Sequence, residues 1–341
     1  MEAKKRYIPI AALLVLGLII PLVVKNAFYM QSVIFVVLYM YWASAWNILG
    51  GYTGLFALGN GLYIGVGAYV VAVMFVDWGI SPWIGMIVAG LVCGLLSIIV
   101  GYPVFRLKGM YYALATLALM SVFEVVFNNE NTIFGIFTGG ANGMRFPMTG
   151  KAWDMQFSSK TGYYFIVLAL LIIILLCSDW ITHSKMGYYF RSIRANPDAA
   201  ASLGVDVLRY KLTAHFISAF FTGIGGAIYV CSSMYVSART VFGIDLSFAM
   251  MLFCIVGGAN TLWGPILGAV IMVPVQQALR IAAGAKLAAM STLVYGLVLC
   301  VVMLFMPDGI LGQLRKLMVK RKKQAAAALS SAAQEGGGVN G

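Results

Sequence analysis

Few side chains in this chain of 341 residues have the chemistry for catalysis. Only two are histidines, His183 and His215, and both lie at the edges of apolar runs. A histidine metal site or a nucleophile–base pair needs several such groups within reach of one another. A phosphate-binding loop is also missing, because Lys151 lacks a glycine at the required spacing and a Ser or Thr after it. The sequence therefore predicts no catalytic residue, no metal ligand and no cofactor bound by this chain.

A second set of polar side chains lies within or beside apolar segments, where polar groups are costly and therefore informative. Hydrogen bonding between helices and contact with a passing solute are both open for each of them. Glu124 lies near the end of its apolar run and either lines a polar mouth, pairs with Arg280 or extends to a membrane interface. The candidates for a solute path are Asn47, Thr53, Gly54, Asn60, Thr116, Glu124, Asn260 and Thr261.

The segment after Asn196 carries the residues that begin and end a helix. Asn196 is a favoured N-cap, Pro197 suits the first helical position, and Gly204 suits the position after the C-cap. A helix from Pro197 to Leu203 would be only about 10 Å long, so it needs a partner to pack on. We expect this small, alanine-faced helix to dock a soluble partner. Its candidate residues are Arg191, Arg194, Asn196, Pro197, Asp198, Ala199, Ala200 and Gly204.

The composition is that of an integral membrane protein. Hydrophobic residues make up 62% of the chain and charged residues only 10%. Soluble domains usually carry about 25% charged residues. We expect membrane lipid around most of the chain, with no room left for a soluble catalytic domain.

Apolar runs of roughly 17–25 residues are long enough to span a membrane as helices. About ten runs qualify or nearly qualify, and the third and eighth are short enough to be re-entrant or broken helices. The sequence thus predicts an all-α integral membrane protein of about ten transmembrane helices. The candidate spans are 8–24, 29–49, 61–76, 82–104, 110–127, 162–181, 212–236, 244–258, 264–282 and 288–306.

The basic residues predict the orientation. The net charge of +12 comes from clusters at the N-terminus, in the 182–211 segment and in the 315–323 segment. This is the pattern of the positive-inside rule, and it argues against nucleic-acid binding. We expect a multi-pass protein of the cytoplasmic (inner) membrane with both termini in the cytoplasm. Residues 1–314 would form the transmembrane domain, and 315–341 a basic and then disordered cytoplasmic tail.

Two groups of glycines interrupt the apolar runs. One occupies residues 50–67, between the second and third spans, and the other occupies 257–268, between the eighth and ninth. Glycines at such positions either let helices pack closely or break helices near a solute path. Because the two groups fall in matching places of the two halves, the pattern favours discontinuous helices around a path.

Short motifs follow one another along the chain: NILGGYTGL at 47–55, LG at 58–59, GVGAY at 65–69, RLKG at 106–109, YALATL at 112–117, TGGANG at 138–143, GG at 257–258, TLWGP at 261–265 and PDG at 307–309. In this order they resemble the permeases of branched-chain amino acid ATP-binding-cassette transporters of the LivM type. The resemblance covers roughly residues 30–312, and its specificity comes from the order of the whole set. Asp198 stands where Glu is usual in the family's cytoplasmic coupling loop, and Asn60 stands where many relatives carry His.

The resemblance implies a non-catalytic permease subunit that carries branched-chain amino acids. It implies that Asp198-Ala199-Ala200, followed by Gly204, is the ATPase-coupling loop and that ATP is used only by partner subunits. The implied partners are a second, homologous permease, two ATPase subunits and an extracytoplasmic solute-binding protein. Two alternatives remain open: an ATP-driven permease for urea or short amides, and a secondary transporter that works alone.

Overall fold

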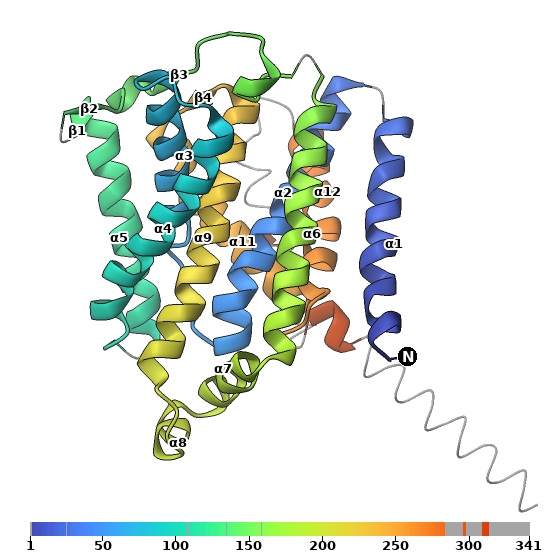
Figure 1. Ribbon diagram of the computed structural model, residues 1–341, viewed down its shortest axis with the longest axis vertical. Coiled ribbons are helices and arrows are strands. Elements are labelled where there is room, and N and C mark those ends of the chain that lie inside the picture. Colours follow the sequence, from blue (N-terminus) through green and yellow to red (C-terminus); the bar gives the residue numbers. More distant parts are fainter. Residues whose placement is uncertain are drawn as a thin grey trace, which may run out of the picture.

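The long apolar runs form long helices in the computed structural model, which stand side by side as one bundle (Figure 1). The structure describes residues 2–24, 26–107, 109–133, 135–157, 159–283, 296–297 and 309–313. The helices are α1 (Glu2–Val23), α2 (Ala27–Trp46) with its π-helical extension η1 (Asn47–Gly51), α3 (Gly61–Val76), α4 (Pro82–Val104), α5 (Met110–Asn129), α6 (Thr161–His183), α7 (Lys185–Ala195), α8 (Pro197–Ser202), α9 (Val207–Ser233), α10 (Ala238–Val241), α11 (Ile244–Gly257) and α12 (Gly264–Ala283).

The helices agree with an all-α membrane protein. Within the described ranges, six helical segments are long and apolar enough to cross a membrane, and three further apolar helices are shorter. The six are Phe28–Gly51, Pro82–Val104, Met110–Asn129, Thr161–His183, Val207–Ser233 and Ala238–Gly257, and the shorter three are Pro9–Leu22, Gly61–Val76 and Gly264–Leu279. Only residues 296–297 of the predicted tenth span, 288–306, are described, and the predicted tail, 315–341, lies outside the described residues, so the number ten stays a prediction.

The end of the bundle opposite α7 and α8 carries short strands and turns. Strands β1 (Thr132–Ile133) and β2 (Ile136–Phe137) form one antiparallel hairpin. Strands β3 (Met144–Arg145) and β4 (Tyr235–Val236) form a second antiparallel pair. The second pair ties the segment before α6 to the chain that follows α9.

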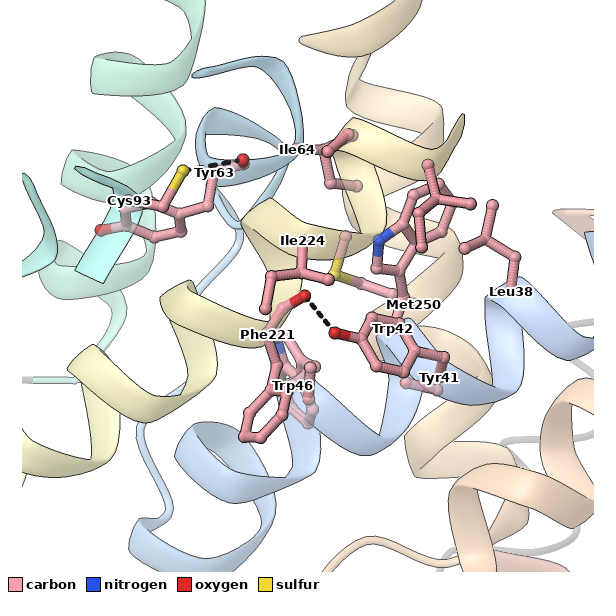
Figure 2. Packing of buried hydrophobic residues seen from close by; sticks show 14 of the residues in the cluster. Leu38, Tyr41, Trp42, Trp46, Tyr63, Ile64, Cys93, Phe221, Ile224 and Met250 are labelled. Carbon is pink, nitrogen blue, oxygen red and sulfur yellow. Dashed lines mark hydrogen bonds between the residues drawn. The ribbon is translucent and has the colours of Figure 1, made fainter. Parts of the chain in front are cut away.

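The core is built around the second half of α2, where Tyr41, Trp42 and Trp46 are fully buried (Figure 2). The Tyr41 hydroxyl donates to the carbonyl of Phe221 at 2.6 Å, and the Trp46 indole N–H donates to the carbonyl of Ala57 at 2.9 Å. Buried Tyr and Trp side chains usually find such partners, because an unpaired polar group in an apolar region is costly. These two bonds fix α2 to α9 and to the chain that follows η1.

Glycines bring α9 into direct backbone contact with α3. A Cβ atom added to Gly67 would lie 2.3 Å from the carbonyl oxygen of Gly223, and one added to Gly226 would lie 2.2 Å from that of Ile64. Small residues allow this close approach, which supplies the van der Waals contact that holds helices together in lipid. The close-packing role predicted for the glycines is therefore confirmed at the α3–α9 contact.

The beginning of α1 lies at the same end of the bundle as α7 and α8 (Figure 1). This agrees with the expectation that the N-terminus and the basic segment share one side of the membrane. Which side faces the cytoplasm stays a prediction from the positive-inside pattern.

Candidate functional site

The first glycine-rich region is a break between two helices. Helix α2 ends in the π-helical turn η1, and residues 54–60 then run without regular secondary structure to the start of α3. Gly54 adopts a left-handed conformation with φ of 75°, which glycine reaches without strain. Single π-helical turns inside helices often mark functional sites. The break predicted from the 50–67 glycines is therefore present.

The second glycine-rich region breaks α11 from α12. Helix α11 ends at Gly257, and residues 258–263 turn the chain before α12 begins at Gly264. The Thr261 hydroxyl donates to the carbonyl of Gly258 at 2.6 Å and accepts the N–H of Gly264 at 3.0 Å. Thr261 thus holds the turn closed and satisfies an N–H at the start of α12.

The side chain of Asn47 joins the two breaks. Its Nδ2 donates to the carbonyl of Thr261 at 2.9 Å, and its Oδ1 accepts the backbone N–H of Asn260 at 2.9 Å and the thiol of Cys254 at 3.4 Å. A Cβ atom on Gly51 would lie only 1.7 Å from Oδ1, so the glycine leaves the room that this amide occupies. The matching positions seen in sequence therefore correspond to direct contact in space.

Two hydroxyls fix the chain between η1 and α3. The Thr116 hydroxyl on α5 donates to the carbonyl of Ala113 at 2.8 Å and accepts the N–H groups of Leu58 and Gly59 at 3.2 and 3.3 Å. Ser247 on α11 accepts the N–H of Gly61 at 3.1 Å and donates to the carbonyl of Leu58. Both hydroxyls therefore hydrogen-bond to backbone groups that have no partner within a helix.

Ser247 was missed by the sequence analysis, although it is a polar residue within an otherwise apolar stretch of α11. Thr53, in contrast, bonds within its own turn, since its hydroxyl donates to the carbonyl of Leu49 at 2.6 Å. The structure thus brings Asn47, Thr261 and Asn260 together and places Thr53 beside them in local contact only. Their contact with a solute stays a prediction.

Asn60, at the N-cap position of α3, is buried without partners for its side chain. Its exposed fraction is 1%, and neither Oδ1 nor Nδ2 has a hydrogen-bond partner among the described residues. The Oδ1 of Asn260 also lacks a hydrogen-bond partner among the described residues, and the backbone of Asn260 is left-handed, with φ of 67°. Unpartnered amides in an apolar core are rare because they are costly, and they call for a functional explanation. Both amides belong to the predicted solute path.

Glu124 stands apart from this centre. It lies on α5 and is half-buried. Its pairing with Arg280 stays a prediction, because the side chain of Arg280 lies outside the described residues.

The short helix expected after Asn196 is present and begins as predicted. The Asn196 side chain accepts the N–H groups of Asp198 at 3.0 Å and Ala199 at 3.1 Å, and Pro197 is the first residue of α8. Asp198 lies in the first turn, where a negative charge is favoured by the helix dipole. The cap is therefore supplied by Asn196, with Asp198 as an exposed side chain on the first turn.

Helix α8 also ends at the predicted glycine. Gly204 has φ of 85°, its N–H bonds to the carbonyl of Ala201 at 2.9 Å, and the N–H of Val205 bonds to that of Ala200 at 3.1 Å. This pair of bonds is the Schellman arrangement that closes helices with a left-handed residue. Ser202 is the last helical residue, one earlier than expected. A helix of six residues is thus fixed at both ends without a partner.

Helix α7 precedes α8 and was not expected from the sequence. It buries Gly187, Phe190 and Ile193, which are spaced three residues apart along one face. Arg191 is exposed on this helix. Arg194 lies in its last turn, and its Nη1 donates to the carbonyl of Gly51 at the end of η1. The basic segment therefore touches the first break directly.

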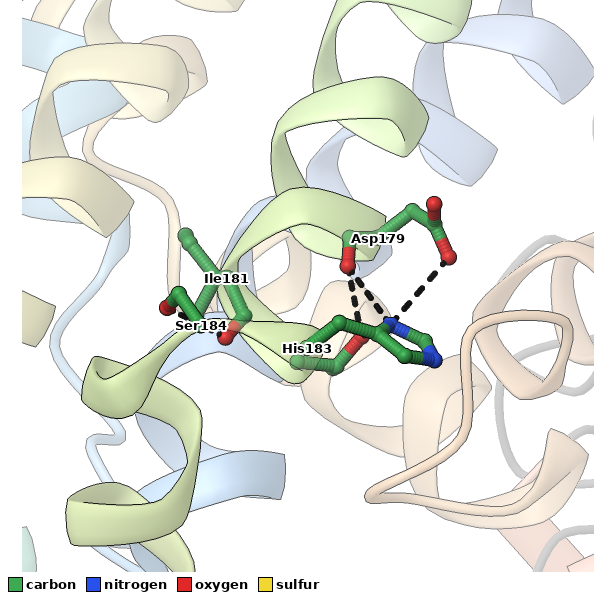
Figure 3. A network of polar contacts seen from close by, with 5 residues as sticks. Asp179, Ile181, His183 and Ser184 are labelled. Carbon is green, nitrogen blue, oxygen red and sulfur yellow. Dashed lines mark hydrogen bonds and ion pairs between the residues drawn. The ribbon is translucent and has the colours of Figure 1, made fainter. Parts of the chain in front are cut away.

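The junction between α6 and α7 is a compact polar corner (Figure 3). The Nδ1 atom of His183 lies 2.9 Å from the carbonyl oxygen of Asp179 and 3.7 Å from its carboxylate. The Ser184 hydroxyl donates to the carbonyl of Ile181 at 2.8 Å. These contacts close the end of α6 and set the direction in which α7 leaves the bundle.

Comparison with known proteins identifies the family. The family model described as "Branched-chain amino acid transport system / permease component" matches residues 28–304. The chain belongs to this family. It is thus a multi-pass permease component of the inner membrane. No solved structure matches the chain.

Relatives of the permease agree with this assignment. The chain is 27% identical over 335 residues to the high-affinity branched-chain amino acid transport system permease protein LivM of Escherichia coli, covering 91% of this chain and 76% of that one. It is 24% identical to the probable branched-chain amino acid transport permease protein LivH of Methanocaldococcus jannaschii, over 62% of this chain and 68% of that one. A shorter match, 34% identical over 109 residues, joins it to the nucleoside ABC transporter permease protein NupC of Lactococcus lactis, over 31% of this chain and 32% of that one.

Proposed function

We propose that this permease is the membrane-spanning subunit of an ATP-driven importer that carries branched-chain amino acids into the cytoplasm. Family membership and the LivM and LivH relatives support the substrate class. The chain binds no nucleotide in this proposal, and hydrolysis takes place in separate ATPase subunits. Its own contribution is a path through the membrane and a surface on which the ATPases act.

The single observation that carries the ATPase contact is the pre-formed helix α8 at the base of the bundle. Its side chains are small, only Ala200 is buried among Pro197–Ser202, and the C-cap residue Leu203 is 85% exposed. Tyr188 on α7 is 66% exposed. A short helix that is capped at both ends, with apolar side chains left in solvent, suits insertion into a groove of a soluble partner.

The proposed assembly has one further permease in the membrane and three subunits outside it. A second, homologous permease would lie beside this one in the membrane and complete the path. A solute-binding protein would deliver the amino acid at the end that carries β1 to β4. Two ATPase subunits would dock at the opposite end, one on each permease.

The path itself is proposed to open at the two joined breaks. Discontinuous helices at the centre of transporters let rigid groups rock around a fixed site. In this structure the bonds of Asn47 hold the two breaks together, while both amide atoms of Asn60 and the Oδ1 of Asn260 lack hydrogen-bond partners among the described residues. Opening the breaks would expose these amides to a passing solute, which satisfies their hydrogen bonding.

The substrate is tested by the solute-binding protein that associates with the permease. The binding protein is captured on the purified assembly, and its affinity for leucine, isoleucine, valine, urea and nucleosides is measured by calorimetry. Tight binding of the three branched-chain amino acids is expected. Binding of a nucleoside instead would indicate that the permease carries nucleosides, as the name of NupC says of that protein. Binding of urea would support the amide alternative.

A further inference from the structure

One side chain of the basic segment reaches the first break. Arg194, in the last turn of α7, donates a hydrogen bond through Nη1 to the carbonyl of Gly51. Its Cγ also lies 3.0 Å from the position of a Cβ on Gly54, three residues beyond the end of η1. The guanidinium and its stem thus hold both the last residue of η1 and the turn that follows it.

The residue that Arg194 holds is the one that packs against the second break. A Cβ on Gly51 would lie 1.7 Å from the Oδ1 of Asn47 and 2.9 Å from the backbone nitrogen of Asn260. The carbonyl of Gly51 therefore accepts a hydrogen bond from α7, and its Cα packs against the residues that join the two breaks. A displacement of Gly51 displaces those residues, because no free space separates them from it.

The chemistry of the hydrogen bond between Arg194 and Gly51 suits the transmission of movement from α7 to η1. The last carbonyls of a helix bear partial negative charge, so a cation at the end of η1 is favoured. A hydrogen bond from a guanidinium is roughly twice as strong as one between neutral groups. Helix α7 is joined to α8 through the single residue Asn196, whose N–H bonds to the carbonyl of Ser192 at 3.0 Å, so the two helices form one stiff unit.

We propose that Arg194 is the positioning residue that transmits movement of α7 and α8 to both breaks. The inference rests on the proposed function, since the movement is supplied by ATPases docked on α8. When those subunits shift α8, Arg194 draws Gly51 with it, and the Asn47 contact carries the shift to residues 258–263. Arg194 touches neither the solute nor ATP in this scheme.

The test compares three variants of the whole assembly in lipid vesicles. Arg194→Met keeps the stem and removes the donor, Arg194→Lys restores a charged donor, and Arg209→Met removes an exposed arginine elsewhere in the basic segment as a matched control. Three quantities are measured for each: ATPase subunits retained on purification, ATP hydrolysed, and leucine taken up per ATP. Thermal stability in detergent is measured in parallel.

Arg194→Met is expected to retain the ATPases and hydrolyse ATP, while uptake per ATP falls roughly tenfold, the scale of one charged hydrogen bond. Arg194→Lys should restore much of that uptake, and Arg209→Met should match the wild type. Wild-type uptake per ATP in Arg194→Met overturns the inference. Loss of the ATPases or of thermal stability in both Arg194 variants also overturns it, because Arg194 would then serve docking or folding. Neither result contradicts the proposed importer, which fails if the unaltered permease retains no ATPases.

Discussion

The amide of Asn47 bonds to the backbone of Thr261, with Nδ2 and the carbonyl oxygen 2.9 Å apart, across 214 residues of sequence. The bond joins the end of α2 to the turn before α12, so the two glycine-rich breaks form one structural unit. Rigid helices that are joined by a few directional hydrogen bonds can move as a hinge or gate.

Asn47→Leu should lower the stability of the fold. The substitution keeps the side-chain volume, removes the bond to Thr261 and leaves the N–H of Asn260 without its acceptor. We expect a loss of roughly 1–3 kcal/mol, the range for two hydrogen bonds within a membrane protein. Thermal unfolding in detergent measures it. Ser44→Ala is the control on the same helix, because its hydroxyl bonds only within α2, to the carbonyl of Met40. Equal stability of the two variants would mean that the Asn47 bonds do not hold the breaks together.

Asn60→Leu should separate stability from transport. Because neither atom of the Asn60 amide has a partner among the described residues, replacing it with an apolar group of similar size should leave stability unchanged or raise it. Uptake should fall if the amide meets the solute when the breaks open. Both are measured on one preparation, by thermal unfolding and by leucine uptake in vesicles. Unchanged uptake would remove Asn60 from the proposed path.

Gly204→Val should weaken ATPase binding without disturbing insertion in the membrane. Valine is strained at φ of 85°, so the end of α8 must rearrange, although no atom lies within 4 Å of the added Cβ. Gly79→Val is a close control, since Gly79 has φ of 65°, open space around it and a place between α3 and α4. Co-purification of the ATPases is the measurement. If Gly204→Val retains them as well as Gly79→Val does, α8 is not the docking helix.

Ser202→Cys should be labelled only from the cytoplasm. Ser202 is exposed at the end of α8, and the positive-inside pattern places this end of the bundle inside. A membrane-impermeant maleimide applied to intact cells should leave it unlabelled and should label Met148→Cys, whose side chain is 91% exposed near the opposite end. The reverse pattern would invert the orientation of the whole permease.

Local signals in the sequence were sufficient for several elements. The capping residues Asn196, Pro197 and Gly204 predicted α8 to within one residue, and the apolar run 61–76 coincides with α3. These elements could be predicted because caps and apolar runs act over a few residues. Helix α7 was missed since its polar, basic composition hides a buried face of only Gly187, Phe190 and Ile193.

Contacts between distant segments were beyond the sequence. The glycine groups indicated two breaks, but nothing in their spacing placed Asn47 against Asn260 or Arg194 against Gly51, which are 213 and 143 residues apart. The same limit applies to Thr116 and Ser247, whose bonds to the chain before α3 depend on how α5 and α11 pack. The sequence identifies polar residues near a solute path. Only the structure separates those whose side chains hydrogen-bond to the backbone from those whose side chains have no partner.

The central claim is that this permease passes branched-chain amino acids when ATPases act on it from one side. The most direct measurement is uptake of labelled leucine by vesicles that contain the permease, its partner permease and the ATPases, with ATP inside and the binding protein outside. Leucine is expected to accumulate only when both ATP and the binding protein are present, and isoleucine and valine should compete with it. Leucine uptake by the permease alone, without ATP, would contradict the central claim.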